Sequence, residues 1–271
     1  MIWIWRDGRV LAQAPLVDPA WAAWGAFTTA GACGGRPLLW PWHRERLAAT
    51  LLLLEPGLEA NLPAEAAVAD LLDRSELSGP GRVRVVARRS ERETGWTVEA
   101  SATPWQGGGA EAAPLRLVVE RWPAAGPLAE HKTLARLPWE LARRRAQRLG
   151  ADDAVLVDGA GRVLETTVSN LFARFGVRLV TPLVPGRCLP GVMRRWLVES
   201  AVGVGLEVVE RDLGLDELLA ADEVWATNAL VGVRRVATVG TRRWRQWEKW
   251  PAVAGLGVPA PGWSSAAGAA E

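Results

Sequence analysis

Residues 130–138 read EHKTLARLP and place Lys132 just before an apolar pattern with helical spacing. The chain has 32 lysines and arginines, and apart from Lys132 only Lys249 is a lysine. An arginine stays charged at physiological pH, whereas a lysine amine can lose its proton and act as a nucleophile. A lysine kept among so many arginines therefore raises the question of what a primary amine would do here, although a lysine beside a helix start is most often an ordinary surface residue.

The sequence after Lys132 predicts alternating helices and strands. Leu134, Leu137 and Leu141 recur at helical spacing and predict a helix that runs to about Leu149 and is closed by a glycine. The stretch AVLVDGAGRVLETT then predicts a hairpin with a Gly-rich turn. A further helix is expected directly after the LPG of residues 189–191.

The first half of the chain predicts a smaller unit. Helices are expected at about 43–54 and 64–73, and GRVRVVARR (81–89) alternates Arg with Val as a strand does. A strand at 115–122 runs into PAAGPLAE, which breaks any regular pattern. We therefore predict a mixed α+β and α/β fold in two domains, namely a smaller domain at 1–122, a linker at 123–129, a larger domain with the lysine at 130–258 and a disordered tail at 259–271.

Composition and charge argue against several classes of protein. The formal net charge of the 271 residues is +2, which gives no strong field for nucleic acid. The longest apolar run, residues 47–54, is too short to span a bilayer, and charges among the first ten residues predict no signal peptide. Two cysteines and two histidines at irregular spacing predict neither a disulfide nor a metal site. A cytoplasmic protein is expected.

Three polar groups besides the lysine stand where chemistry is often placed. Glu165 lies among apolar and Thr residues of a predicted strand, where the ordinary alternative is a solvent-facing side chain. Gly191 precedes a helix whose first backbone N–H groups suit a phosphate, although a turn and cap explain it equally well. Thr227 and Asn228 follow a predicted strand, in a loop position that often carries a site.

Taken together, these motifs resemble the class IV aminotransferases, which are fold-type IV pyridoxal-phosphate enzymes. The resemblance starts from residues 131–172, which carry the lysine, the helix after it and a Glu-x4-Asn-x-Phe stretch. HRERL (43–47) matches the family's His-x-x-Arg-Leu, and LPGVMRR (189–195) matches its Leu-x-Gly-Ile-x-Arg. The matches follow in order from about residue 25 to 236, which implies a two-domain enzyme with the cofactor between the domains.

The resemblance also implies a role for each matched residue. Lys132 would bind pyridoxal 5′-phosphate as a Schiff base and shuttle protons, and Glu165 would pair with the pyridine nitrogen. Arg46 would hold the phosphate, with the backbone N–H groups of Val192 and Met193 and the side chain of Asn228. The family further implies a small-molecule substrate and a homodimer, with no nucleic acid, membrane or metal involved.

Within the family, the sequence is most similar to the 4-amino-4-deoxychorismate lyases of folate biosynthesis, which release pyruvate and 4-aminobenzoate. TNAL (227–230), the pair Arg136-Leu137 and GAFTTA (25–30) carry this similarity. Thr28 or Thr29 would then protonate the departing pyruvate as a general acid, although an ordinary pair of strand threonines is an equal alternative.

Some positions depart from the lyase pattern and keep alternatives open. Trp24 stands where the lyases have Asp, and Ala135 replaces an Asn. RSERETGW (89–96) keeps the first Arg and the Gly-aromatic pair of the lyases' Arg-Gly-x-x-x-Arg-Gly-Tyr segment, as Arg89 and Gly95-Trp96, but not the second Arg of that segment. Arg89 is therefore a candidate for a substrate carboxylate, against the more common case of an exposed strand arginine. A branched-chain or D-amino-acid aminotransferase is the alternative. A non-enzymatic binding protein, based on the Arg- and Trp-rich runs at 141–148 and 241–250, is more remote.

Overall fold

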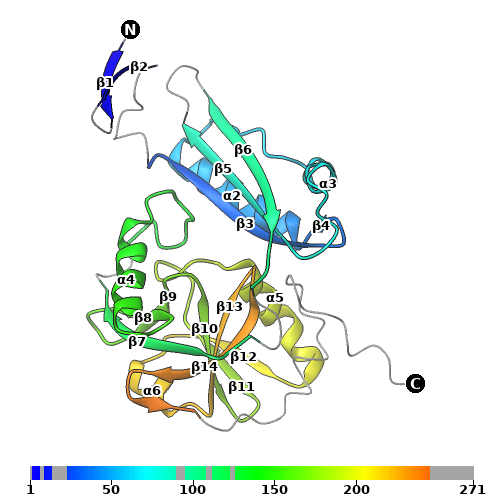
Figure 1. Ribbon diagram of the computed structural model, residues 1–271. Helices are drawn as coiled ribbons and strands as arrows, with labels where there is room; N and C mark the ends of the chain where they lie inside the picture. The colour runs from blue at the N-terminus through cyan, green and yellow to red at the C-terminus, as the bar shows by residue number, and fades with distance from the viewer. Residues whose placement is uncertain are drawn as a thin grey trace.

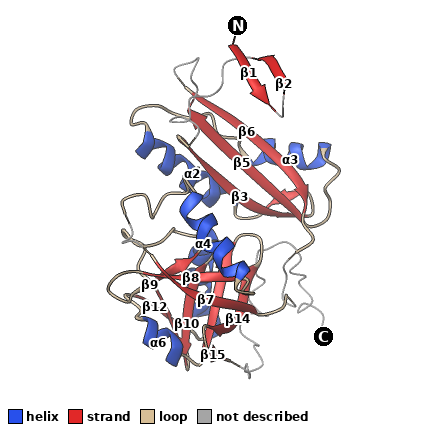
Figure 2. Cartoon of the chain, turned by 60° about the vertical axis from the view of Figure 1, so that its left-hand side comes forward, coloured by secondary structure: helices blue, strands red, loops and turns tan. Residues whose placement is uncertain are grey.

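The computed structural model describes residues 2–6, 9–13, 23–89, 95–107, 112–122 and 126–244. Its strands form three sheets, with two, four and nine strands. The small sheet pairs β1 (Ile2–Arg6) with β2 (Arg9–Gln13). The four-stranded sheet and the helices packed on it form one part of the molecule, called the smaller layer below. The nine-stranded sheet and its helices form the other part, called the larger layer (Figures 1 and 2).

The four-stranded sheet is antiparallel and has helices packed on one face. Its strand order is β4-β3-β5-β6, with β3 at Gly25–Cys33, β4 at Arg36–Pro37, β5 at Gly81–Arg89 and β6 at Trp96–Pro104. Helices α2 (Trp40–Leu54) and α3 (Glu65–Arg74) share a core with small or β-branched residues of β3 and β5. The helices at 43–54 and 64–73 and the strand at 81–89 are therefore confirmed.

The packing of β5 on the helices decides on which face of the sheet its arginines lie. Val83, Val85 and Ala87 are fully buried against the helices. Successive strand residues point to opposite faces, so Arg82 and Arg84 lie on the face away from the helices. That face is turned toward the larger sheet.

The nine-stranded sheet has the order β12-β11-β10-β13-β14-β7-β8-β9, with β15 also paired to β14. Its elements, in chain order, are β7 (Leu115–Arg121), α4 (Leu137–Arg148), β8 (Asp153–Val157), β9 (Val163–Thr166), β10 (Asn170–Phe175), β11 (Arg178–Thr181), α5 (Val192–Ser200), β12 (Glu207–Glu210), α6 (Leu215–Ala220), β13 (Glu223–Asn228), β14 (Gly232–Val239) and β15 (Arg242–Arg243). The hairpin β8–β9 and the helix after residue 191 are confirmed. None of the helices in the described ranges is long and apolar enough to cross a membrane.

Two details differ from the sequence-based expectation. Strand β7, which we placed in the first domain, pairs with β8 and β14 of the nine-stranded sheet, so we propose the domain boundary between β6 and β7. Helix α4 starts at Leu137, next to Pro138, which suits the first turn of a helix. The side chains that α4 buries are Ala142 and Ala146, and these small residues let the helix approach the sheet closely. Leu137, in contrast, is 68% exposed. The tail at 259–271 lies outside the described residues.

The two layers are joined at Lys132 by main-chain hydrogen bonds. The N–H of Phe27 donates to the carbonyl of Lys132 at 3.0 Å, and the N–H of Leu134 donates to the carbonyl of Gly25 at 2.9 Å. These bonds make an antiparallel bridge between Ala26 and Thr133. The lysine therefore belongs to the larger layer in sequence, but its backbone is fixed on β3 of the smaller one.

Gly25 makes this approach sterically feasible, and its replacement tests the bridge. A Cβ at Gly25 would lie 2.3 Å from the carbonyl oxygen of Ala87 and 2.9 Å from Cδ1 of Leu134. We expect Gly25→Ala to lower the free energy of unfolding by about 1–3 kcal/mol, the usual cost of overpacking. Gly79→Ala is the control, because a Cβ at Gly79 meets no atom within 4 Å. Urea denaturation measures both, and equal effects would contradict the argument.

Candidate active site

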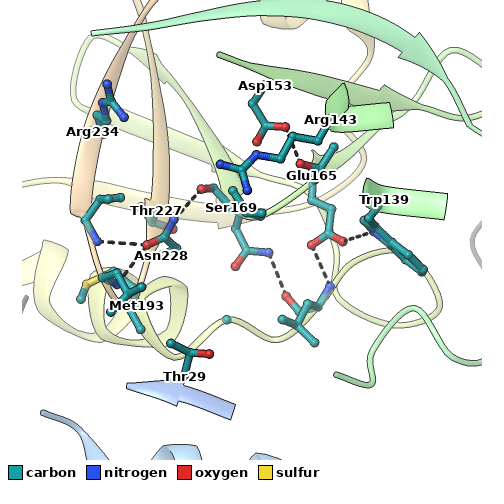
Figure 3. A pocket seen from close by; sticks show the side chains of 18 of the residues that line it. Thr29, Trp139, Arg143, Asp153, Glu165, Ser169, Met193, Thr227, Asn228 and Arg234 are labelled. Carbon is teal, nitrogen blue, oxygen red and sulfur yellow. Dashed lines mark hydrogen bonds between the residues drawn. The ribbon is translucent and has the colours of Figure 1, made fainter. Parts of the chain in front are cut away.

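A cavity of about 920 Å³ lies between the two layers and collects polar side chains from both. Basic residues dominate the part of it around Lys132, where Glu165 is the buried acid. Figure 3 shows the wall from the larger sheet, with Thr29 reaching the cavity from β3 on the opposite side. The lining residues that matter below are Phe27, Thr29, Arg46, Arg82, Arg84, Lys132, Arg136, Trp139, Glu165, Gly191, Val192, Met193, Thr227 and Asn228.

Lys132 presents its amine to the cavity from the bridge on β3. Its Nζ lies 4.8 Å from the centre of the Phe27 ring, and the guanidinium of Arg84 lies 4.4 Å from the centre of the same ring. Burial lowers the pKa of Lys132 well below its ordinary value, and the charges of Arg46 and Arg136 lower it further, while Glu165 acts in the opposite direction. The amine is therefore prepared to lose its proton and react.

Glu165 is a buried carboxylate, so the alternative of a solvent-facing strand residue is wrong. All four residues of β9 are buried, and Glu165 is 6% exposed. Its carboxylate accepts hydrogen bonds from the backbone N–H of Leu189 at 3.2 Å and from the indole of Trp139 at 3.4 Å (Figure 3). Burial raises the pKa of Glu165, opposed by the charge of Arg136 and the Leu189 hydrogen bond.

The turn at residues 189–191 carries the start of α5. Asn170 donates from Nδ2 to the carbonyl of Leu189 at 2.8 Å, and a Cβ at Gly191 would lie 2.0 Å from Oδ1 of Asn170. Only a glycine fits beside this amide. No side-chain hydrogen bond caps α5 in the described part of the chain, and Val192 and Met193 of its first turn line the cavity. The uncapped N–H groups of a helix start are suited to binding an anion.

The loop after β13 uses Asn228 differently from the expectation. Its Nδ2 donates to Ser169 at 3.0 Å, and its Oδ1 accepts from the backbone N–H groups of Leu230 and Val231, both at 3.0 Å (Figure 3). The side chain thus shapes the loop through both ends of its amide. The neighbouring hydroxyl of Thr227 is buried at the cavity and has no hydrogen-bond partner among the described residues.

Arg46 reaches the cavity from α2 of the smaller layer. It donates from Nη1 to the carbonyl of Pro190 at 3.3 Å and from Nη2 to Oγ1 of Thr28 at 3.2 Å. Its Nε is buried and has no partner in the part of the chain that the structure describes. Burial lowers the pKa of Arg46 to about 10, opposed by the charge of Glu165.

The structure separates the two candidate threonines. Thr29 lines the cavity, whereas Thr28, its neighbour on β3, is 1% exposed and its hydroxyl contacts His43 and Arg46. Residues that follow each other on a strand point to opposite faces, so only one of the pair can face the cavity directly.

Arg89 does not line the cavity. It forms an ion pair with Glu55 at 3.5 Å and donates to the carbonyl of Gly95 at 2.9 Å. Arg82 and Arg84 line the cavity instead, and we missed them in the sequence. The alternation of Arg with Val in β5 was the available signal, because it places these two arginines on one face.

The donors at this end of the cavity fit the phosphorylated aldehyde cofactor that the family resemblance implies. An anion would satisfy three groups here. They are the Nε of Arg46 and the hydroxyl of Thr227, which have no hydrogen-bond partner in the described part of the chain, and the uncapped start of α5. The amine of Lys132, whose pKa is lowered, is a partner for the aldehyde. The buried carboxylate of Glu165 is a partner for the ring nitrogen.

Comparisons with known proteins agree with this geometry. Residues 25–239 match the family model for amino-transferase class IV. The aminodeoxychorismate lyase of Vibrio harveyi is 29% identical over 251 residues, which cover 87% of this chain and 90% of that enzyme. Branched-chain-amino-acid aminotransferase 6 of Arabidopsis thaliana is 42% identical over 96 residues, and the match spans 35% of this chain but only 27% of that protein.

A solved structure shares the fold. The pyridoxal-phosphate-bound form of a hypothetical aminotransferase from Mycobacterium tuberculosis has a TM-score of 0.76 and 24% identity. The alignment covers 92% of this chain and 94% of that one. Both layers of the structure are therefore part of the likeness.

The lowered pKa of Lys132 gives a pH dependence that can be measured on the cofactor-free chain. Only the neutral amine undergoes reductive methylation, and lowering the pKa makes the amine neutral at lower pH. We expect the methylation rate at Lys132, followed by peptide mass spectrometry, to reach half its maximum well below the pH required by N-acetyl-lysine amide. Because Glu165 raises the pKa of Lys132, Glu165→Gln should shift the profile to still lower pH. A profile that coincides with the model amide would contradict the burial argument.

Proposed function

The chain belongs to the class IV aminotransferase family, and from that membership we propose that it is a lyase which converts 4-amino-4-deoxychorismate into 4-aminobenzoate and pyruvate. It is a pyridoxal-phosphate enzyme with the two-domain fold of fold type IV. The observation that carries the lyase assignment is the cavity loop TNAL (227–230), which is similar to the Asn-Ala-Leu signature of the lyases. The match to the Vibrio lyase along most of both chains supports it.

In this proposal Lys132 is both the attachment point of the cofactor and the base. Bound pyridoxal phosphate supplies an electron sink that stabilises negative charge on the amine-bearing carbon of the substrate. Lys132 removes the proton from that carbon, and its lowered pKa makes the neutral amine available for this step. The ring of Phe27 forms a wall beside the amine and limits its positions.

Glu165 would hold a proton on the ring nitrogen of the bound cofactor. To do so it must stay ionised although burial raises its pKa. Arg136 opposes that effect by its charge, and the N–H groups of Leu189 and Trp139 by hydrogen bonds. Arg136 also lies over the Trp139 ring at 4.1 Å and donates to the carbonyl of Thr167 at 2.9 Å, which keeps both groups near the carboxylate.

The phosphate of the cofactor would be held at the junction of the two layers. Arg46 would donate its free N–H groups from one side, and the backbone N–H groups of Val192 and Met193 would donate from the start of α5. Thr227 adds its hydroxyl, while Asn228 contributes by fixing the loop at Leu230.

The substrate occupies the remaining space near β3 and β5. Arg84 and Arg82 are the proposed partners of its carboxylates, in place of Arg89, because they line the cavity and form no ion pair with any residue in the described ranges. The C–O bond to the enolpyruvyl group breaks, and its electron pair leaves with the oxygen. Thr29, which lines the cavity, is our candidate in place of Thr28 for passing a proton to the departing group, and the proton that Lys132 took up restores the Thr29 hydroxyl. The ring of the substrate becomes aromatic and keeps the amino group, so the reaction needs no second substrate.

A branched-chain or D-amino-acid aminotransferase is the second candidate. The local match to the Arabidopsis enzyme favours a transaminase, although it covers only 35% of this chain. We also propose a homodimer, as the family resemblance implies. A cytoplasmic location and a place in folate biosynthesis remain predictions.

A paired assay on one preparation tests the function. We expect pyruvate and 4-aminobenzoate from 4-amino-4-deoxychorismate over many turnovers with no keto acid added, because a lyase regains its starting state in each cycle. We expect little glutamate from leucine, isoleucine, valine or D-alanine with 2-oxoglutarate. Glutamate formation without pyruvate release would replace the lyase by the transaminase and leave the cofactor assignment standing.

Two matched substitutions on β5 test the substrate contacts. Arg84→Met removes a cation that faces the cavity, whereas Arg89→Met removes one that is paired with Glu55 outside it. Loss of a charge-assisted hydrogen bond of about 1.5–3 kcal/mol should raise KM roughly 10- to 100-fold for Arg84→Met. Arg89→Met should leave KM unchanged and act on stability instead. A raised KM for Arg89→Met with an unchanged KM for Arg84→Met, measured by steady-state kinetics, would instead identify Arg89 as the carboxylate partner.

A further inference from the structure

The side chains of Thr28 and His43 form a buried hydrogen-bond network with Arg46 that the proposed reaction does not use. Oγ1 of Thr28 lies 2.7 Å from Nδ1 of His43 and accepts a hydrogen bond from Nη2 of Arg46 at 3.2 Å. Thr28 and His43 are each 1% exposed. Little solvent can therefore replace either contact, and a broken one would leave a buried polar group unsatisfied.

The chemistry of the guanidinium fixes the direction of one of these two hydrogen bonds. A guanidinium can only donate, so Arg46 is the donor and the Thr28 oxygen the acceptor. The direction of the bond between Thr28 and His43 depends on the ring tautomer, and we take the arrangement in which the Thr28 hydroxyl donates to Nδ1 of His43. In that arrangement His43 carries its ring proton on Nε2. Burial, with the charges of Arg46 and Lys132, holds the pKa of His43 well below its usual value, which agrees with a neutral ring.

The hydrogen bonds of Arg46 to Thr28 and Pro190 decide which of its N–H groups remain free. A guanidinium has five N–H donors, and the contacts with Thr28 and with the carbonyl of Pro190 use one on each terminal nitrogen. The Nε group and the other terminal hydrogens are left for a ligand. Both partners are uncharged, so they orient Arg46 without neutralising it. His43 is itself held by stacking on Trp40, with the ring centres 6.4 Å apart.

We propose that Thr28 and His43 are positioning residues that hold Arg46 in the orientation in which its free N–H groups meet the phosphate of the cofactor. This inference rests on the proposed phosphate role of Arg46. It gives Thr28 a role distinct from that of Thr29, although the two are neighbours in the sequence. His43 acts through Thr28, by accepting the hydrogen bond that orients the Thr28 hydroxyl.

The test compares two ligands that differ only in the phosphate. The cofactor-free full-length chain is titrated with pyridoxal phosphate and with pyridoxal, and both dissociation constants are followed by absorbance. Thr28→Val keeps the shape of the side chain but removes its hydroxyl. We expect it to weaken pyridoxal phosphate about tenfold, the equivalent of one charge-assisted hydrogen bond, and to leave pyridoxal unchanged. Thr28→Ser should restore the affinity, and His43→Phe should behave like Thr28→Val.

Thr181→Val is the matched control, because Thr181 is also fully buried and donates to the carbonyl of Leu171 at 2.8 Å, outside the cavity. Equal weakening of both ligands by Thr28→Val, or no weakening, would overturn the proposal. Loss of pyruvate release with an unchanged affinity ratio would also overturn it, by placing Thr28 in the reaction itself. If Thr28→Val fails to fold, Thr28→Ser and His43→Phe decide. The affinity ratio does not depend on the substrate, so failure of the lyase assignment would be seen separately.

Discussion

The hydrogen bond from the N–H of Phe27 to the carbonyl of Lys132 is the contact on which the site depends. It fixes the backbone of a residue from the larger layer on a strand of the smaller one. With the second bond at Gly25 it forms a two-residue bridge, and that bridge sets where the lysine amine can reach. A long, flexible side chain becomes a defined nucleophile only when its backbone and one wall of its path, here the ring of Phe27, are both fixed.

The cavity also shows how charge and burial are balanced. Arg46, Arg84, Lys132 and Arg136 lie around it, with Glu165 as their buried counter-charge. Burying like charges near one another is costly unless anions come to meet them. The same environment lowers the pKa of Lys132 and raises that of Glu165, in each case mainly by burial. A site built in this way favours a ligand that brings several negative charges.

Much of this site could be predicted from the sequence, because motif spacing marks positions on the backbone. Lys132, Glu165, Arg46 and the turn before α5 all lie at the cavity as expected. What spacing could not give is the direction of side chains at strand positions whose covered face was unknown. Thr28 and Thr29 could be told apart only once α2 was seen to pack on one face of β3.

The misplaced residues share related causes. Arg89 stands at the end of β5, where its ion pair with Glu55 is a tertiary contact between segments far apart in the sequence. The leucines of α4 predicted a helix correctly but not its buried face, because alanines such as Ala142 allow the closest approach to the sheet. Strand β7 was grouped with the residues before it, although its partners follow it along the chain.

A cavity whose walls come from two layers has a consequence for the energetics of the whole molecule. A ligand that contacts Arg46 on one layer and the start of α5 on the other binds only when both layers are folded and docked. Such binding adds RT ln(1 + [L]/Kd) to the free energy of unfolding, about 2.7 kcal/mol at a hundredfold excess over Kd. In the proposed binding mode the cofactor would act as a reversible cross-link between the layers, and the protein's resistance to heat would become a function of the cofactor concentration around it.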